Sequence, residues 1–194
     1  MEITLDIQMP KLPPAMEHPE QAVKAMLDAS AHAMSNTLIR HFRAKNRTPN
    51  AKGFARSNFW SQAADSVTTR VEPDAAIAEV RKEGVRLRLL GGTVRPRNGR
   101  KALAIPADPS VAGMWPSEHS GKKGGVETFL AWSKSKDAGF IAERGSKTLR
   151  VLWWLKRETR HKPDPTVLPD RKAMATAVQR ACRAVLREMT GGAS

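Results

Sequence analysis

Histidine and cysteine are the residues from which a metal site or a nucleophilic site would most readily be built, and the chain has five histidines and one cysteine. The histidines show neither an H-E-x-x-H motif nor any other paired spacing. The single cysteine, Cys182, cannot supply a cysteine-based zinc site or an intrachain disulfide, and it falls inside a predicted helix that suits a buried, inert thiol. We therefore expect no bound metal and no catalytic cysteine.

Glycine-rich segments are a second source of chemistry, because their backbone N–H groups can bind phosphate. Neither Gly91-Gly92 nor the segment 121–125 (G-K-K-G-G) matches the G-x-x-x-x-G-K-[ST] pattern between a strand and a helix, and no G-x-S-x-G motif occurs. The acidic residues are scattered without an obvious catalytic pair. We predict that the protein is not an enzyme and that it uses no cofactor.

Basic charge is the main positive signal in this sequence. Lysine and arginine number 33 against 19 acidic residues, a formal net charge of +14, and such an excess attracts polyanions or acidic protein surfaces. Three stretches, 40–56, 86–101 and 144–162, are strongly basic. Aromatic residues that could stack on bases lie in or beside them: Phe54, Phe59, Trp60, Trp153 and Trp154. The competing interpretation makes these aromatics core anchors, and we favour it for the two tryptophans of the apolar strand.

The segment 84–107 (G-V-R-L-R-L-L-G-G-T-V-R-P-R-N-G-R-K-A-L-A-I-P-A) contains six basic residues and no acidic one, which is typical of an interaction surface. Its first part, 85–90, is too short for periodicity to distinguish a helical turn from a strand. Gly91-Gly92 then provides a backbone turn, from which a basic extended arm over 93–101 leaves the body of the protein. An apolar strand over 102–105 rejoins the sheet.

The positions of polar, apolar and turn residues predict the elements that carry this segment. Alternation over 2–9 indicates a strand, and an apolar stripe at three- and four-residue steps indicates a helix from Pro19 to about Lys45. A short helix capped by Ser57 or Asn58 and a hairpin over 66–81 should follow. The stripe of the long helix comprises Val23, Met26, Leu27, Ser30, Met34, Thr37, Leu38 and His41.

The second half of the chain predicts an exposed, mobile loop over 108–125, because this part is rich in Gly, Pro, Ser and Lys. Strands are expected over 127–132, 139–144 and 148–156, with side chains alternating between two faces in the last of them. Three prolines favour an extended arm over 157–170, and Asp170 should cap a final helix that ends at Met189. The stripe of that helix comprises Met174, Val178, Ala181, Val185 and Met189.

These elements predict an α+β fold with one mainly antiparallel sheet, built from the 66–81, 101–105 and 127–156 strands. The long N-terminal helix and the C-terminal helix should pack on one face of that sheet. We expect an N-terminal strand or arm over 1–18, a single domain over 19–190 and a tail over 191–194. No apolar window reaches the ~20 residues of a membrane helix, and the N-terminus lacks the pattern of a signal peptide, so we expect no membrane partner.

The order of the motifs resembles that of bacteriophage neck and tail-completion proteins, the virion-morphogenesis proteins similar to the minor tail protein Z of lambda-like phages. The resemblance covers most of the chain from Pro19 to Met189, and a G-G-x-[VI]-x-P segment followed by an A-[IL]-P-A strand is its most telling pair. The motifs are H-F-R (41–43), N-F-W (58–60), G-V-R-L-R-L-L-G-G-T-V-R-P (84–96), K-A-L-A-I-P-A (101–107), V-L-W-W-L (151–155) and P-D-P-T-V-L-P (163–169).

The resemblance implies a structural subunit of the virion neck or tail, assembled in the bacterial cytoplasm, that completes the tail and helps join it to the head connector. Its partners would be further copies of itself in a cyclic ring, for example a hexamer, and neighbouring tail and connector proteins, with transient contact to passing DNA. The alternative is a basic accessory protein that binds DNA without sequence preference. Predicted contact residues are Arg86, Arg88, Gly91, Gly92, Arg95, Pro96, Arg97, Arg100, Lys101, Pro163, Asp164, Pro165 and Pro169.

Overall fold

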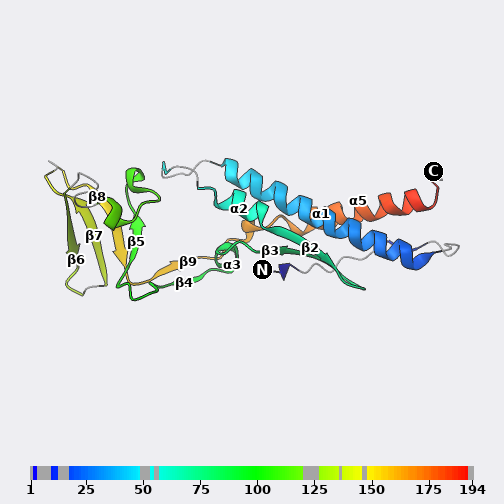
Figure 1. The fold of residues 1–194 in the computed structure, drawn as a ribbon, viewed down its shortest axis with the longest axis horizontal. Coiled ribbons are helices and arrows are strands. Elements are labelled where there is room, and N and C mark those ends of the chain that lie inside the picture. The colour runs from blue at the N-terminus through cyan, green and yellow to red at the C-terminus, as the bar shows by residue number, and fades with distance from the viewer. Residues whose placement is uncertain are drawn as a thin grey trace. The chain divides into compact units, whose positions relative to one another are not determined.

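A computed structural model of the chain describes residues 2–3, 10–12, 18–48, 53–54, 57–119, 127–135, 137–145 and 148–191. It combines long helices with antiparallel sheets, which confirms the predicted α+β class (Figure 1). The single domain expected over 19–190 corresponds to two compact units. Unit 1 comprises Met1–Thr48, Ser57–Leu90 and Asp164–Ser194, and unit 2 comprises Pro49–Arg56 and Gly91–Pro163.

Helix α1 (Pro19–Arg47) is the longest element of unit 1 and confirms the predicted N-terminal helix. Proline occupies its first turn, where the missing N–H costs no intrahelical hydrogen bond. Its buried stripe begins one residue earlier than predicted, since Ala22 is buried whereas Val23 is 37% exposed. The stripe also extends to Phe42, which is fully buried. The buried residues are Ala22, Met26, Leu27, Ser30, Ala31, Met34, Leu38 and Phe42.

Helix α5 (Arg171–Met189) packs against α1, and Asp170 caps it as predicted by accepting a hydrogen bond from the backbone N–H of Ala173. Its buried residues are Met174, Val178 and Cys182, whereas Met189 at the end of the predicted stripe is 41% exposed. The Cys182 sulfur lies 3.2 Å from the Ser30 hydroxyl oxygen. The thiol is thus a small packing group in the helix interface, as the sequence indicated.

A small sheet lies beside α1 in unit 1 (Figure 1). Helix α2 (Phe59–Asp65) leads into a hairpin of β2 (Val67–Val71) and β3 (Ala76–Val80), as predicted, and β1 (Glu2–Ile3) pairs with the free side of β3. Asn58 precedes α2, but its side chain makes no capping hydrogen bond. Residues 4–9 of the predicted first strand lie outside the described residues.

Unit 2 contains a separate four-stranded sheet in the order β5-β8-β7-β6, with every neighbouring pair antiparallel. The prediction of one continuous sheet is therefore wrong, because the 66–81 hairpin pairs only with β1 while the later strands pair with one another. The strands are β5 (Leu103–Pro106), β6 (Thr128–Trp132), β7 (Ala138–Glu143) and β8 (Val151–Lys156). A two-stranded ribbon of β4 (Gly92–Val94) and β9 (Thr159–His161) completes the unit.

A β-bulge breaks the alternation that the sequence predicted for β8. Trp153 pairs with Ile141 while Val151 pairs with Ala142, so that Leu152 is the extra residue between them. Leu152 and Trp153 are consequently both fully buried, and Trp154 is 47% exposed. A pattern of period two cannot anticipate such an insertion, because the signal for it lies in the partner strand.

The segment 108–125 differs from the exposed loop that was expected. Its start forms a 3₁₀ turn, η1 (Pro109–Val111), and Val111 is fully buried against Leu152 and Trp153. A short helix, α4 (Pro116–His119), follows, and residues 120–125 lie outside the described residues. A single apolar side chain thus anchors a stretch whose composition is otherwise that of a loop.

An ion-pair network holds η1 to the sheet. The Arg150 guanidinium donates hydrogen bonds of 2.9 and 3.1 Å to the two carboxylate oxygens of Asp108, and one of 3.2 Å to Glu143. Hydrogen bonds from Arg150 and Ser110 hold the pKa of Asp108 well below its ordinary value of 3.8. Asp108 also caps η1 by accepting from the backbone N–H of Ser110.

None of the helices among the described residues has the length and apolar character to cross a membrane.

This network predicts a specific pH dependence of stability in unit 2. Because the pKa of Asp108 is lowered in the folded state, its stabilising contribution is present above the ordinary aspartate pKa and is lost as the pH falls below about 4. Asp108→Asn should lower the Tm at pH 7, and the difference from wild type should shrink between pH 4 and pH 2 in thermal unfolding followed by circular dichroism. Asp137→Asn, which removes an exposed carboxylate from the same unit, should lower the Tm at pH 7 by much less than Asp108→Asn does.

Phe42 supplies a direct test of the core of unit 1. Its ring is fully buried and stacks on Trp60 at 5.8 Å between centroids, so Phe42→Ala should lower the free energy of unfolding by about 3–5 kcal/mol in urea denaturation. Val23→Ala removes a 37% exposed side chain from the same helix and should cost about 0.5 kcal/mol or less. Equal effects of the two substitutions would show that Phe42 is not a core residue.

Candidate interaction surfaces

The first part of the basic segment 84–107 is helical, which decides between the two conformations that the sequence left open. Helix α3 (Val85–Leu90) buries Val85 completely and exposes Arg86 and Arg88. The Arg88 guanidinium carbon lies 4.4 Å from the ring centroid of Phe59 and 5.5 Å from that of Trp60. Arg88 is therefore bound to aromatic rings of its own chain, whereas Arg86 extends from the exposed side of α3.

Phe59 and Trp60 lie at the centre of a cluster of cations and aromatic rings in unit 1. Trp60 stacks on Phe42, and the Phe59 ring meets Trp60 edge to face with centroids 4.9 Å apart. The Lys45 ammonium lies 5.2 Å from the Trp60 centroid, and that of Lys82 lies 5.9 Å from the Phe59 centroid. The faces of both rings are thus occupied by groups of the same chain, which leaves little ring surface for stacking on bases.

The proline-rich segment 163–169 does not form the free arm that the sequence suggested. Asp164 caps a 3₁₀ turn, η2 (Pro165–Val167), and Val167 is fully buried in the core of unit 1. Thr166 joins this turn to α1, since its carbonyl oxygen lies 3.0 Å from His41 Nε2 and its hydroxyl accepts a 3.0 Å hydrogen bond from the Lys45 ammonium. Proline disrupts the interior of a helix but is tolerated at its first position. The prolines therefore exclude a long helix here and still allow the short 3₁₀ turn that replaces the expected arm.

Asp164 links this turn to α3. Its backbone N–H donates a 3.0 Å hydrogen bond to the Arg88 carbonyl oxygen, and its side chain accepts from the backbone N–H and hydroxyl of Thr166. Hydrogen bonds from Thr166, together with the nearby charges of Lys45 and Arg88, lower the pKa of Asp164. Asp164 thus has an internal structural role, while Pro163 and Pro165 are exposed and Pro169 is half-buried.

Gly91 and Gly92 begin the two-stranded ribbon of unit 2. Gly91 has a φ of +71°, and a Cβ atom at this position would lie 2.7 Å from the carbonyl oxygen of His161 and 2.9 Å from the Pro163 ring. Gly92 pairs with His161 in the ribbon itself. The backbones at the two ends of the segment 91–163 therefore approach each other closely only because residue 91 has no side chain.

The basic arm is a tight turn at its tip. Asn98 and Gly99 have φ values of +56° and +72°, and the N–H of Arg100 donates a 3.3 Å hydrogen bond to the carbonyl oxygen of Arg97. Positive φ at both central residues, with the sequence Asn-Gly, is the signature of a type I′ turn. The predicted contact residues Arg97 and Lys101 are exposed beside this turn, and Pro96 is half-buried.

Two other arginines of the arm have partners within unit 2. Arg95 forms a 3.1 Å ion pair with Glu158, and the guanidinium of Arg100 lies 4.1 Å from the Trp115 ring centroid. Trp115 is 51% exposed, so this stacked pair lies on the surface. The turn thus presents cations beside an ion pair and a stacked tryptophan, whereas the sequence indicated an extended arm.

An exposed aromatic face on the four-stranded sheet was not identified from the sequence. Phe140 pairs across the sheet with Trp154, which pairs in turn with Ile105, so these three side chains share one face. The rings of Phe129 and Trp154 flank Phe140 at centroid distances of 6.0 and 6.2 Å. We call Ile105, Phe129, Phe140 and Trp154 the aromatic sheet face. Within each strand, the sequence shows these apolar residues at alternating positions. Only the pairing of the strands brings the four side chains together on one face.

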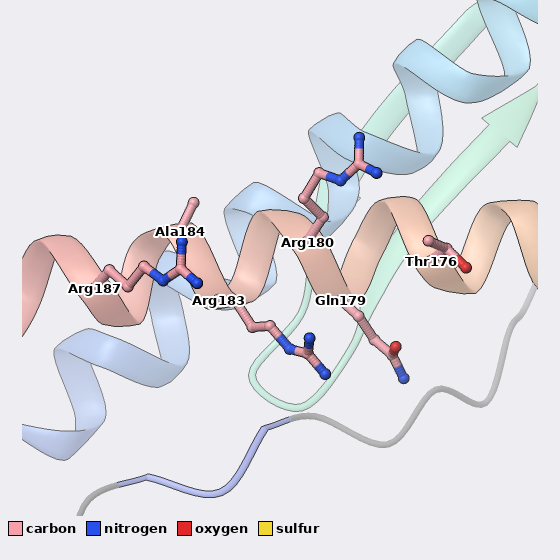
Figure 2. A pocket seen from close by; sticks show the side chains of 6 residues that line it. All are labelled: Thr176, Gln179, Arg180, Arg183, Ala184 and Arg187. Atoms are coloured by element: carbon pink, nitrogen blue, oxygen red, sulfur yellow. The ribbon is translucent and has the colours of Figure 1, made fainter. Parts of the chain in front are cut away.

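The outer face of α5 is a second feature that sequence analysis missed. A hollow of about 330 Å³ lies along this helix, and Figure 2 shows the side chains that line it. Its described lining residues are Thr176, Gln179, Arg180, Arg183, Ala184 and Arg187.

Within the described part of the chain, no cluster of three or more His, Cys, Asp or Glu side chains could hold a metal ion.

The close approach at Gly91 predicts a strong effect of a single methyl group. Gly91→Ala combines an unfavourable positive φ, worth about 1–2 kcal/mol, with contacts of 2.7–2.9 Å to the backbone of His161 and to Pro163, so unit 2 should be markedly destabilised in thermal unfolding. Gly113→Ala has a similar φ of +79° and an open Cβ position, so it isolates the cost of conformation alone. Equal Tm changes in the two variants would contradict the proposed steric role.

Comparisons with protein-family models, with curated protein sequences and with solved structures find no match to this chain. The resemblance to phage neck and tail-completion proteins therefore rests on the order of the sequence motifs.

Proposed function

We propose that the chain is a structural subunit of a bacteriophage neck or tail, one that completes the tail and helps join it to the head connector. The motif order supplies the class of protein. The observation that carries the proposal of a subunit contact is the aromatic sheet face in unit 2, where Trp154 is 47% exposed and Phe129, Phe140 and Ile105 are half-buried.

The aromatic sheet face has the composition of a protein interface. Lys156, two residues after Trp154 on β8, is the charged side chain that the described strands add to this face. Aromatic residues are enriched and charged residues are depleted at the centres of protein interfaces, because burying aromatic surface is favourable and burying unpaired charge is costly. Covering this face with a neighbouring subunit would remove its large apolar side chains from water.

A closed ring requires a second, different patch on each subunit, because a heterologous contact joins two unlike surfaces. The type I′ turn over 97–100 is our candidate, since Arg97 and Lys101 are exposed beside it and Arg100 stacks on an exposed tryptophan. The sequence suggested the proline segment 163–169 as another contact patch. The structure makes it a weaker candidate, because much of the segment packs within unit 1. The family resemblance implies cyclic symmetry, for example a six-fold ring.

Complementation of a phage that lacks the gene tests the proposal. Without the protein, electron micrographs should show heads and tails that fail to join, and supplying the wild-type protein should restore joined particles. Trp154→Glu places a charge on the aromatic sheet face and should fail to restore them, because the face would have to bury an unpaired carboxylate. Infectious titre should fall by at least about ten-fold relative to the wild-type protein.

Val71→Glu is the matched control, since it adds the same charge at a 37% exposed apolar residue of β2 in unit 1. This variant should support assembly. Circular dichroism of both purified variants establishes that each is folded. Particles that join normally without the gene would refute the neck or tail role, and full rescue by a folded Trp154→Glu protein would refute the contact assigned to this face.

A further inference from the structure

The outer face of α5 is a stripe of arginines with no apolar centre. In a helix of 3.6 residues per turn, residues 176, 180, 183 and 187 fall on one side, opposite the buried residues Met174, Val178 and Cys182. Arg180, Arg183 and Arg187 are exposed along this side, and their guanidinium groups follow one another along the helix (Figure 2). We call these three residues the α5 arginine stripe.

Within the described residues, the arginines of this stripe have no counter-charge, unlike several other arginines on the surface. Arg70, Arg81 and Arg95 form ion pairs of 3.1–3.2 Å with glutamates. No member of the α5 arginine stripe forms an ion pair within the described residues. The helix carries five basic residues and one acidic residue, Glu188, so like charges lie close together with little compensation. Such an arrangement costs electrostatic free energy unless an anion binds to it.

The spacing of the stripe fits a phosphate backbone. With a rise of 1.5 Å per residue, Arg180 and Arg187 are separated by about 10 Å along the helix, which is the axial rise covered by about three successive phosphates of one DNA strand. Guanidinium groups match phosphate oxygens with two parallel hydrogen bonds, and the Gln179 amide adds a neutral hydrogen-bond donor to the same hollow.

We infer that the α5 arginine stripe binds the phosphate backbone of a nucleic acid, without reading its sequence. An acidic protein is the poorer fit, because a protein interface normally has an apolar centre and Ala184 is the only apolar side chain among the described residues that line the hollow. The basic stretches at 40–56, 86–101 and 144–162 do not include this helix, so the inference identifies a new surface. It stands independently of the proposed role in the phage neck or tail.

The test is binding of the purified, full chain to a labelled duplex of mixed sequence, about two helical turns long, followed by fluorescence anisotropy over a series of KCl concentrations. The variant Arg180→Ala/Arg183→Ala/Arg187→Ala should bind at least about ten-fold more weakly near 0.1 M salt. The slope of log Kd against log salt should fall by about 2–3, which corresponds to the loss of about three phosphate contacts. Alanine is a strong helix former, so α5 should persist in circular dichroism spectra.

The matched control is Arg70→Ala/Arg81→Ala/Arg144→Ala, which lowers the net charge of +14 by the same three units at exposed, ion-paired positions. It should keep the wild-type salt slope. Equal weakening by the two triple variants would show that net charge alone drives binding and would overturn the inference. Competition by polyglutamate as effective as that by DNA of equal charge would assign the stripe to an acidic protein instead.

A third variant keeps the charge and changes the geometry. Arg180→Lys/Arg183→Lys/Arg187→Lys should retain the wild-type salt slope while binding a few-fold more weakly, because ammonium groups cannot form the paired hydrogen bonds of a guanidinium. Affinity and slope both equal to those of the alanine variant would contradict phosphate contact by these side chains. Since the measurement uses purified protein and DNA, its failure is distinguishable from any failure of virion assembly.

Discussion

The packing of α5 against α1 closes unit 1, because these two helices come from opposite ends of the described chain. Small side chains allow the close approach: Ser30 and Cys182 face each other at 3.2 Å, and the Ser30 hydroxyl donates to the Met26 carbonyl oxygen so that its polarity is satisfied within the interface. The remainder of unit 1, with the hairpin and α2, packs on this pair of helices. The segment that forms most of unit 2 therefore leaves unit 1 and returns to it between residues 90 and 164.

This arrangement gives each helix a face for the core and a face for solvent. On α5 the inner face carries small and apolar residues, and the outer face carries the arginines that we propose to contact phosphate. On α1 the exposed C-terminal end instead supplies Lys45 to Trp60 and to Thr166, which fastens α2 and η2 to the helix. Basic residues in this protein thus divide into those that hold the fold together and those that remain for a partner.

The aromatic residues also fall into an internal group and an exposed group. This distinction separates the proposed protein contact from the proposed binding of nucleic acid. Phe42 and Trp153 are fully buried, and the Phe59 and Trp60 rings are flanked by cations of the same chain. The core role that the sequence favoured for both tryptophans of β8 is wrong for Trp154, which is 47% exposed in a row of aromatic rings on the sheet. A largely uncharged row of this kind suits protein contact, whereas the outer face of α5 suits nucleic acid, so the two proposed roles use separate surfaces.

The sequence by itself determined the elements whose signals are local. The stripe of α1, the Asp170 cap of α5 and the turn between β2 and β3 depend on residues within a few positions of one another, and local sterics and hydrogen bonding suffice to specify them. Two locally plausible expectations, the exposed 108–125 loop and the free proline arm, were altered by long-range contacts. Val111 and Val167 became buried because distant residues enclose them.

Only the tertiary structure decided how the strands are partitioned into sheets, where Leu152 bulges from β8, and which side chains meet on the aromatic sheet face. Strand pairing joins residues far apart in the chain, and no periodicity within a single strand records its partner or register. The position of the arginines on α5 was readable from their spacing, but their exposure and the absence of ion pairs to them among the described residues were not. Those properties depend on which face of the helix the core of unit 1 covers, and that is set by the packing of α5 against α1.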